Sequence, residues 1–190
     1  MADVFTIGHS TRDADAFMAL LGEAGVRLLA DVRRFPRSRR HPQFNADRLA
    51  ATLAAADIGY RHFPALGGRR TPQEASPNTL WTEPGFRGYA DYAATPEFRA
   101  ALDALEGLAR ATPTAIMCAE AAWWRCHRRI IADYLIADGF SVHHVLAPGR
   151  IEPARLTEGA RRRDDRTLVY PAGARDGHAG DLFDGLREDS

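Results

Sequence analysis

Two short blocks of reactive side chains lie close together in the sequence. Cys118 and Glu120 are separated by one residue, and six positions later Cys126 is followed directly by His127 and Arg128. A cysteine thiolate is both a nucleophile and a metal ligand, and histidine and glutamate transfer protons near neutral pH. We therefore expect one site in which a thiol is the nucleophile or a ligand, with Glu120 and His127 as acid and base.

The same residues could instead bind a metal ion. Zinc takes about four ligands, which Cys118, Cys126 and His127 would supply together with His9 or Glu120. The sequence contains no Cys-x-x-Cys pair, so the spacing matches no common zinc motif. A zinc or iron ion is one hypothesis for this site, an activated thiol is another, and two buried apolar cysteines are the third.

A second group of candidates is rich in arginine. Five arginines lie between positions 33 and 40, and no acidic residue occurs from position 32 to position 46. The planar guanidinium binds phosphate and carboxylate oxygens, and Phe35 or Phe44 could stack on a base. This segment favours a small anionic ligand or a nucleic acid, with a solvated basic loop as the alternative. Trp123 and Trp124 are expected to pack in the interior.

Composition limits the classes of partner. The 190 residues include 25 basic and 25 acidic side chains, and no lysine is present. A net charge of zero provides no overall field that attracts polyanions, so any contact with nucleic acid must be local. Two cysteines are too few for a disulfide framework. Without a long apolar run or a secretion signal, the sequence predicts a cytoplasmic protein with no membrane contact.

Alternating strand and helix patterns predict the frame that positions these residues. The strand patterns cover residues 4–8, 28–32, 60–65, 114–117 and 140–146. Helical patterns follow the first, second and fourth strands, and another helix begins with Thr95 as N-cap and Pro96 in its first turn. Strands separated by helices favour right-handed crossovers. We expect one α/β domain over residues 1–150, a mainly parallel sheet of about five strands flanked by helices, and a polar extension over residues 151–190.

Local signals add four further predictions. Ser10 or Thr11 is expected to cap the first helix, and Ser10 is more a helix cap than an anion contact. Residues 67–88 contain glycine, proline and asparagine without a sustained period, which predicts a long loop. Residues 167–170 would add an edge strand. Residues 173–190 are expected to form a loosely held tail.

The carboxyl ends of parallel strands meet at one edge of a sheet, where open α/β proteins bind their ligands. Four predicted strands carry polar residues at or near that end, including the pair His143 and His144, of which only one can face a site. The predicted catalytic residues are His9, Asp31, Cys118, Glu120, Cys126 and His127. The predicted anion-binding residues are Ser10, Arg33, Arg37 and Arg128.

Six ordered blocks resemble the family called domain of unknown function 488. They are residues 6–10, Asp31 to Arg33 with Pro36, Ser38 and Arg39, residues 66–68, 86–90, 118–120 and 126–128. The resemblance implies a compact α/β fold and a shared site, and it implies no activity. That site would contain His9, Asp31, Arg33, Cys118, Glu120, Cys126, His127 and Arg128.

Together, these patterns favour a hydrolase- or transferase-like enzyme with a Cys/His/Glu site and an arginine clamp for a phosphate-bearing, nucleotide-like substrate. One alternative is a nucleic-acid-binding module linked to repair or processing, which would use the segment from Arg33 to Arg40. The other is a metal-binding protein that uses the two cysteines and His127.

Overall fold

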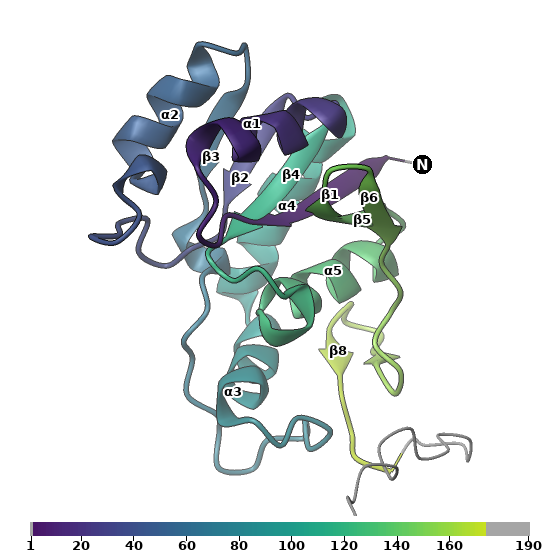
Figure 1. The fold of residues 1–190 in the computed structure, drawn as a ribbon. Helices are drawn as coiled ribbons and strands as arrows, with labels where there is room; N and C mark the ends of the chain where they lie inside the picture. Colours follow the sequence, from purple (N-terminus) through teal and green to yellow (C-terminus); the bar gives the residue numbers. More distant parts are fainter. Residues whose placement is uncertain (1, 174–190) are drawn as a thin grey trace, which may run out of the picture.

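A six-stranded sheet forms the centre of the computed structural model, which describes residues 2–173 (Figure 1). Its strands are β1 (Asp3–Gly8), β2 (Leu28–Asp31), β3 (Gly59–His62), β4 (Thr114–Cys118), β5 (Ser141–Ala147) and β6 (Arg150–Pro153). The order across the sheet is β3-β2-β4-β1-β5-β6. The first five strands in this order are parallel, and β6 is antiparallel to β5. The predicted mainly parallel α/β sheet is confirmed, with one additional strand.

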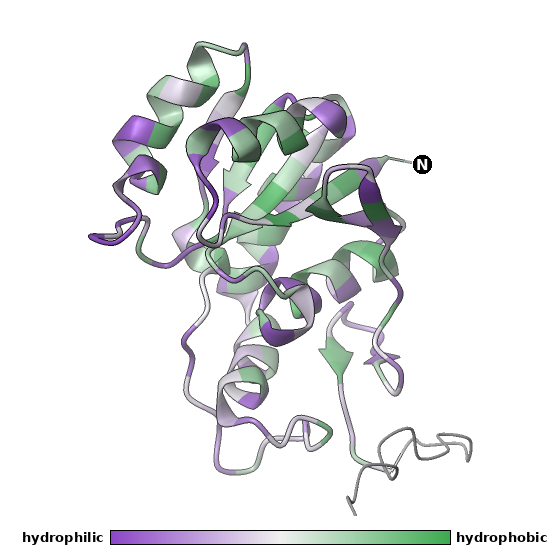
Figure 2. Cartoon of the chain, viewed as in Figure 1, coloured by the Kyte–Doolittle hydropathy of each residue, from purple (hydrophilic) through white to green (hydrophobic). Residues whose placement is uncertain are grey.

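Helices cover both faces of this sheet, as Figure 1 shows. They are α1 (Ala14–Glu23), α2 (Ala46–Ala54), α3 (Pro84–Ala93), α4 (Pro96–Ala111) and α5 (Arg128–Ala137). The apolar residues of α1 and α2 form one core with one face of the sheet, and those of α3, α4 and α5 form a second core with the other face. Green, hydrophobic segments accordingly lie inside the fold in Figure 2, and many purple segments lie at its edges.

The central strand β4 illustrates why the apolar runs form strands here. Ala115 and Met117 belong to the core beneath α1 and α2, whereas Ile116 belongs to the core beneath α3, α4 and α5. Successive side chains of a strand point to opposite faces, so a strand that is buried on both faces needs an uninterrupted apolar sequence.

The chain path creates a crevice at the carboxyl ends of β1, β2 and β4. The loops after β1 and β2 lead to α1 and α2 on one face, whereas the loop after the intervening β4 leads to α5 on the other. Loops that diverge to opposite faces leave a crevice between them, which is where doubly wound proteins bind ligands. Of the predicted strand-end residues, His9, Ser10, Arg33, Cys118 and Glu120 lie at this crevice.

The N-terminal cap of α1 differs from the prediction. Asp13 is the cap, and its Oδ1 accepts a hydrogen bond from the Ala16 N–H at 2.7 Å. Ser10 lies further from the helix and has a left-handed φ of 51°. The chain needs the residues between Gly8 and Asp13 to turn from the strand, so neither Ser10 nor Thr11 is at the helix start.

The predicted loop over residues 67–88 is too long, because α3 begins at Pro84. Two glycines and a low apolar content hide this helix in the sequence. Its stability comes from tertiary packing, since Tyr89 is buried and its hydroxyl donates to the Leu66 carbonyl at 2.6 Å. Thr95 caps the following helix α4 as predicted, with Pro96 at its first position.

The segment after β6 packs against α5. A small second sheet pairs β7 (Arg161–Arg162) with β8 (Leu168–Val169), so residues 167–170 do not extend the main sheet as predicted. The buried Tyr170 hydroxyl donates to Asp133 of α5 at 3.0 Å, and its N–H donates to Asn78 at 2.9 Å. The predicted tail lies outside the described residues, apart from Gly173. Within residues 2–173, no helix is long and apolar enough to cross a membrane.

Candidate functional site

A cleft of about 1150 Å³ occupies the crevice at the strand ends. Eight of the ten predicted site residues line it, and the two that do not are Asp31 and Arg128. Those lining it are His9, Ser10, Arg33, Arg37, Cys118, Glu120, Cys126 and His127. The two sequence blocks around the cysteines therefore share one cavity with residues from the N-terminal third of the chain.

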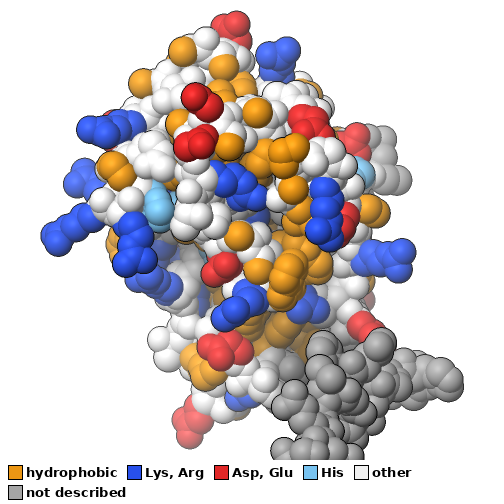
Figure 3. All heavy atoms as spheres, in the orientation of Figure 1, with side chains coloured by type: hydrophobic (Ala, Val, Ile, Leu, Met, Phe, Trp, Pro, Cys, Tyr) orange, Lys and Arg blue, Asp and Glu red, His pale blue; other side chains and the backbone are white. Residues whose placement is uncertain are grey.

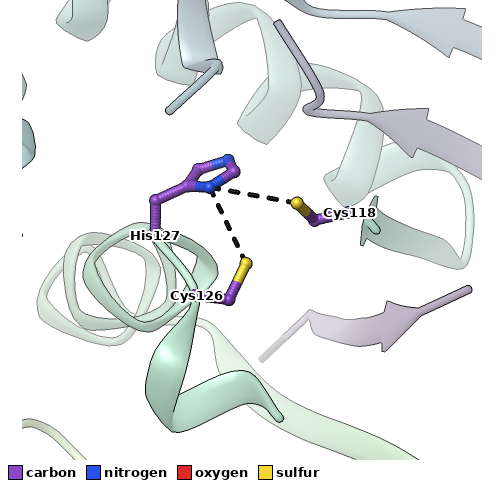
Figure 4. Close-up of side chains that lie close together, drawn as sticks. All are labelled: Cys118, Cys126 and His127. Carbon is purple, nitrogen blue, oxygen red and sulfur yellow. Dashed lines mark hydrogen bonds between the residues drawn. The ribbon is translucent and has the colours of Figure 1, made fainter. Parts of the chain in front are cut away.

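Cys118, Cys126 and His127 point toward one another at this cleft (Figure 4). Cys118 ends β4, and Cys126 and His127 immediately precede α5. The Nδ1 atom of His127 lies 4.0 Å from the Cys118 Sγ and 3.7 Å from the Cys126 Sγ. All three potential ligand atoms lie within 4.8 Å of one another. The donor atoms of two thiols and one imidazole at these separations suit a transition-metal ion.

The ring of His127 is held in one orientation from both sides. Its Nε2 lies 3.0 Å from the Val32 carbonyl, which can only accept a hydrogen bond. A neutral ring that donates from Nε2 carries its lone pair on Nδ1, which faces the two sulfurs. Gly68 lies against the same ring edge, and a Cβ atom there would be 2.9 Å from Nδ1. The absence of a side chain at Gly68 therefore leaves room for this ring position.

The two thiols have different electrostatic environments. The neighbouring Cys118 thiol lowers the pKa of Cys126 well below the usual value, and His127 and Arg128 also lower it. Arg128 is buried, and its Nε donates to the Cys126 Sγ at 3.3 Å. Interaction with Cys126, together with burial, raises the pKa of Cys118. The environment of the pair therefore favours the thiolate at Cys126 over the thiolate at Cys118.

Arg128 therefore faces the protein interior. A second guanidinium nitrogen donates to the Glu120 carbonyl, which ties the start of α5 to the turn after β4. Only 1% of this residue is exposed. The positive charge of Arg128 acts on Cys126 and on the turn after β4. A ligand in the cleft would not contact this side chain.

Asp31 and Arg33 form a buried ion pair behind the cleft. Arg33 donates from Nε and Nη2 to the Asp31 carboxylate, with a shortest distance of 2.6 Å, and the Tyr60 hydroxyl donates to it at 2.8 Å. The remaining Arg33 contacts are Nη2 to the Phe44 carbonyl at 2.8 Å and Nη1 to His9 at 3.3 Å. A guanidinium has five N–H groups, so Arg33 retains about one for a ligand.

His9 lies between this ion pair and the cleft. Its Nδ1 donates to the Ser10 carbonyl at 2.9 Å, and its ring stacks on Phe44 with centroids 4.3 Å apart. Burial, together with the nearby positive charge of Arg33, lowers the pKa of His9 to about 4. His9 is therefore neutral near pH 7 and accepts from Arg33 through Nε2.

Glu120, Ser10 and Arg37 lie at the accessible edge of the cleft. Glu120 is exposed, and its carboxylate accepts a long hydrogen bond of 3.4 Å from the Ala122 N–H. Arg37 is also exposed. These side chains can reach a bound molecule, which makes Glu120 the freest acid or base of the predicted set.

Sequence reasoning missed several residues of the cleft, among them Arg69, Tyr89 and Trp124. Arg69 belongs to the segment predicted as a loop, which passes close to His127 at Gly68, and Tyr89 directly follows that segment. The signals in the sequence were the pair of glycines at positions 67 and 68 and the family-like block over residues 86–90. Trp124 was expected to be buried but is 52% exposed, whereas Trp123 stacks on His144 with centroids 4.1 Å apart.

Neither His143 nor His144 lines the cleft. His143 is partly exposed and lies 3.3 Å from the Asp3 carboxylate. His144 is buried on the opposite face of β5, where its Nδ1 lies 2.8 Å from the Thr6 hydroxyl. Burial, followed by the nearby Arg128 charge, lowers the pKa of His144 to about 4.

Replacing His144 with phenylalanine should change how stability depends on pH. Between pH 6.5 and about 4 the unfolded chain gains a proton on His144 that the folded chain does not, so acidification destabilises the parent. This contribution reaches at most about 3 kcal/mol. We expect His144→Phe to gain that stability relative to the parent on going from pH 7 to pH 4, measured by urea unfolding. His143→Phe controls for the loss of a histidine, and a pH-independent difference for His144→Phe would contradict the assignment.

The fold and site define a doubly wound α/β protein with two cysteines and a histidine gathered at the crevice where its central strands end. The chain belongs to the family described as Domain of unknown function DUF488, which matches residues 13–135. The match begins after His9 and includes Asp31, Arg33 and the complete segment from Cys118 to Arg128. Neither the curated proteins nor the solved structures gave a significant match. The family assignment confirms the resemblance and carries no activity.

Proposed function

We propose that the protein is an enzyme whose metal centre, formed by Cys118, Cys126 and His127, acts on an anionic, phosphate-bearing substrate in the cleft. The observation that carries the proposal is the convergence of three potential ligand atoms within 4.8 Å of one another at that cleft. The reaction class that this arrangement supports is hydrolase- or transferase-like chemistry.

The distances support a metal of the size of zinc. Bonds of about 2.3 Å to sulfur and 2.0 Å to nitrogen place these atoms roughly 3.6 Å apart around a tetrahedral ion. The Nδ1 of His127 lies 3.7 Å from one sulfur and 4.0 Å from the other, so small side-chain shifts suffice. The contact of Nε2 with the Val32 carbonyl is also typical, because ligating histidines usually donate their other N–H to such a group. Iron accepts the same donors.

Three protein ligands leave a coordination position for water or substrate, which is the arrangement of catalytic rather than structural zinc sites. A metal held by Cys118, Cys126 and His127 would supply Lewis-acid chemistry at the cleft. Glu120 is on the accessible edge of the cleft and would accept or donate the proton in the reaction.

The charge of the cleft supports an anionic substrate. Five arginines line it, against two glutamates. Arg33 is largely committed to Asp31, so the other four would bind the anion: Arg34, Arg37, Arg69 and Arg125. Guanidinium groups suit phosphate because they donate two parallel hydrogen bonds.

A metal-free thiol enzyme is the second candidate, favoured by one specific contact. The buried Arg128 donates to the Cys126 Sγ at 3.3 Å, and the pKa of this thiol is lowered well below its usual value by the neighbouring Cys118 thiol and by the neighbouring charges. A thiolate held in this way is a nucleophile at neutral pH.

Metal analysis of the untagged chain, purified without a metal-affinity step, separates these candidates. We expect about one zinc or iron ion per chain, and a loss of more than about tenfold in metal content for Cys118→Ser, Cys126→Ser and His127→Ala. His41→Ala is the matched control, because His41 lines the same cleft outside the cluster. Its metal content should equal that of the parent.

Substoichiometric metal after incubation with Zn²⁺ and Fe²⁺ would exclude the metal centre. Alkylation with iodoacetamide at pH 7 then tests the thiol candidate, which requires fast modification of Cys126 and protection by inorganic phosphate or pyrophosphate. Slow modification of both cysteines in a metal-free chain would contradict both versions of the proposed function.

A further inference from the structure

Two large aromatic side chains are exposed beside the arginines of the cleft. Phe35 is 65% exposed and Trp124 is 52% exposed, and both line the cavity. Leu156 is the other exposed large apolar residue of the described chain, and it does not line the cleft. Exposed aromatic rings that concentrate at a cavity indicate a surface that a ligand covers.

Neighbouring aromatic rings hold the Trp124 side chain in place. It packs edge-to-face on Trp123, with ring centroids 5.7 Å apart and an interplanar angle of 89°. Trp123 in turn stacks on the buried His144 at 4.1 Å, and His144 contacts the Thr6 hydroxyl. The Trp124 ring is therefore held on the strands β1 and β5 through its neighbours, which limits the entropy it would lose on stacking against a ligand.

Phe35 lies in the loop after β2, and the contacts of its neighbour Arg34 hold this loop in place. The Arg34 guanidinium lies 5.6 Å from the Phe35 ring centroid, and its Nη1 donates to the Arg69 carbonyl at 2.9 Å. These contacts join the segment after β2 to the segment around Gly68. Phe35 follows β2 and Trp124 follows β4, and these two strands are neighbours in the sheet.

Both arginines and exposed aromatic rings line this cavity. Arg34, Arg37, Arg69 and Arg125 line it together with Phe35 and Trp124. Figure 3 shows the same mixture on the visible face, with basic side chains gathered over the segment between β2 and α2 and hydrophobic side chains between basic ones over the turn that precedes α5. Cationic groups next to aromatic platforms are how proteins hold a phosphate and its attached base together.

We propose that the cleft binds a nucleotide unit, with its base stacked on Trp124 or Phe35 and its phosphate held by the arginines. This inference rests on the proposed function and deepens it by naming the substrate class. An inorganic or sugar phosphate would use the arginines and leave both rings exposed. A purely apolar partner would bury four arginine charges without compensation, which is unfavourable.

Isothermal titration of the full chain with five probes tests the proposal. The probes are inorganic phosphate, ribose 5-phosphate, AMP, a single-stranded dodecathymidylate and a duplex of matched length. We expect AMP or the single strand to bind more tightly than the first two probes. A single strand that binds much more tightly than AMP, with steep salt dependence, assigns the unit to a nucleic acid, and equal binding assigns it to a free nucleotide.

Aromatic variants separate stacking from charge. Base stacking predicts that Trp124→Ala or Phe35→Ala weakens binding of the preferred nucleotide probe by about 5- to 150-fold, with phosphate binding unchanged. Leu156→Ala is the matched control, because it removes an exposed apolar side chain away from the cleft. Arg125→Ala should weaken the binding of every probe.

Nucleotide probes that bind no better than ribose 5-phosphate would overturn the inference, as would parental binding by both aromatic variants. Either result could occur with a stoichiometric metal and with phosphate binding intact, in which case the proposed function stands and only the substrate class fails.

Discussion

Gly8→Ala is expected to lower the free energy of unfolding by about 3 kcal/mol or more, because the new methyl group would collide with backbone rather than with a movable side chain. A Cβ atom at Gly8 would lie 2.0 Å from the Glu120 carbonyl oxygen and 2.9 Å from the Ala121 Cα. Relief of this clash would stretch two hydrogen bonds of the same strand end, from His9 to Cys118 and from Ser10 to Ala119, each 2.9 Å long. Urea unfolding monitored by circular dichroism measures the loss.

Gly22→Ala provides the matched control. Gly22 is an exposed residue within α1, and a Cβ atom there would have no neighbour within 4 Å. This variant should be stabilised by about 0.5–1 kcal/mol, because alanine has the higher helix propensity. Similar stabilities for the two variants would show that β1 and the turn after β4 do not need this close approach. A folded Gly8→Ala chain should also show altered iodoacetamide reactivity at Cys118, which ends the displaced strand.

Asp31→Asn is expected to destabilise the chain by about 3–5 kcal/mol, because it leaves the buried charge of Arg33 without its counter-ion. The carboxylate is fully buried and accepts from both Arg33 and Tyr60. The measurement is chemical unfolding at pH 7.

The matched control for this substitution is Asp103→Asn. Asp103 forms an ion pair with Arg99 at 2.7 Å, but its side chain is 51% exposed. Exposed pairs contribute about 0–1 kcal/mol, so the same chemical change should have a small effect there. If the two variants lose equal stability, Arg33 has another counter-charge, and the pair behind the cleft is not what fixes the segment after β2.

The parallel α/β fold could be predicted because its information is local. β4 contains the apolar run from Ala115 to Met117, and the caps of helices such as α4 are encoded within a few residues. Helix α3 could not be predicted in this way, since its glycines disfavour a helix and tertiary contacts of residues such as Tyr89 outweigh that preference. The cap of α1 was misassigned because serine, threonine and aspartate are equally good caps in sequence, and only the turn geometry selects Asp13.

The location of the site could be predicted from the sequence, but the directions in which its side chains point could be predicted less well. The rule that parallel strands end at one edge brought His9 and Cys118 together across more than half of the chain. Sequence spacing does not say which way a side chain points, so Arg128 and Asp31 were grouped with residues that face the cleft although both are buried behind it. Loop residues such as Arg69 and Trp124 have no periodicity and become visible only when the loops are placed.

The environment of His127 has a consequence for cooperativity. Its ring lies against the Val32 carbonyl after β2, Gly68 after β3, Cys118 at the end of β4 and Cys126 before α5, so four segments of the chain meet around one imidazole. Local opening of any one of them would remove one side of the environment that surrounds His127. A ligand bound there would therefore stabilise all four segments as a unit by mass action.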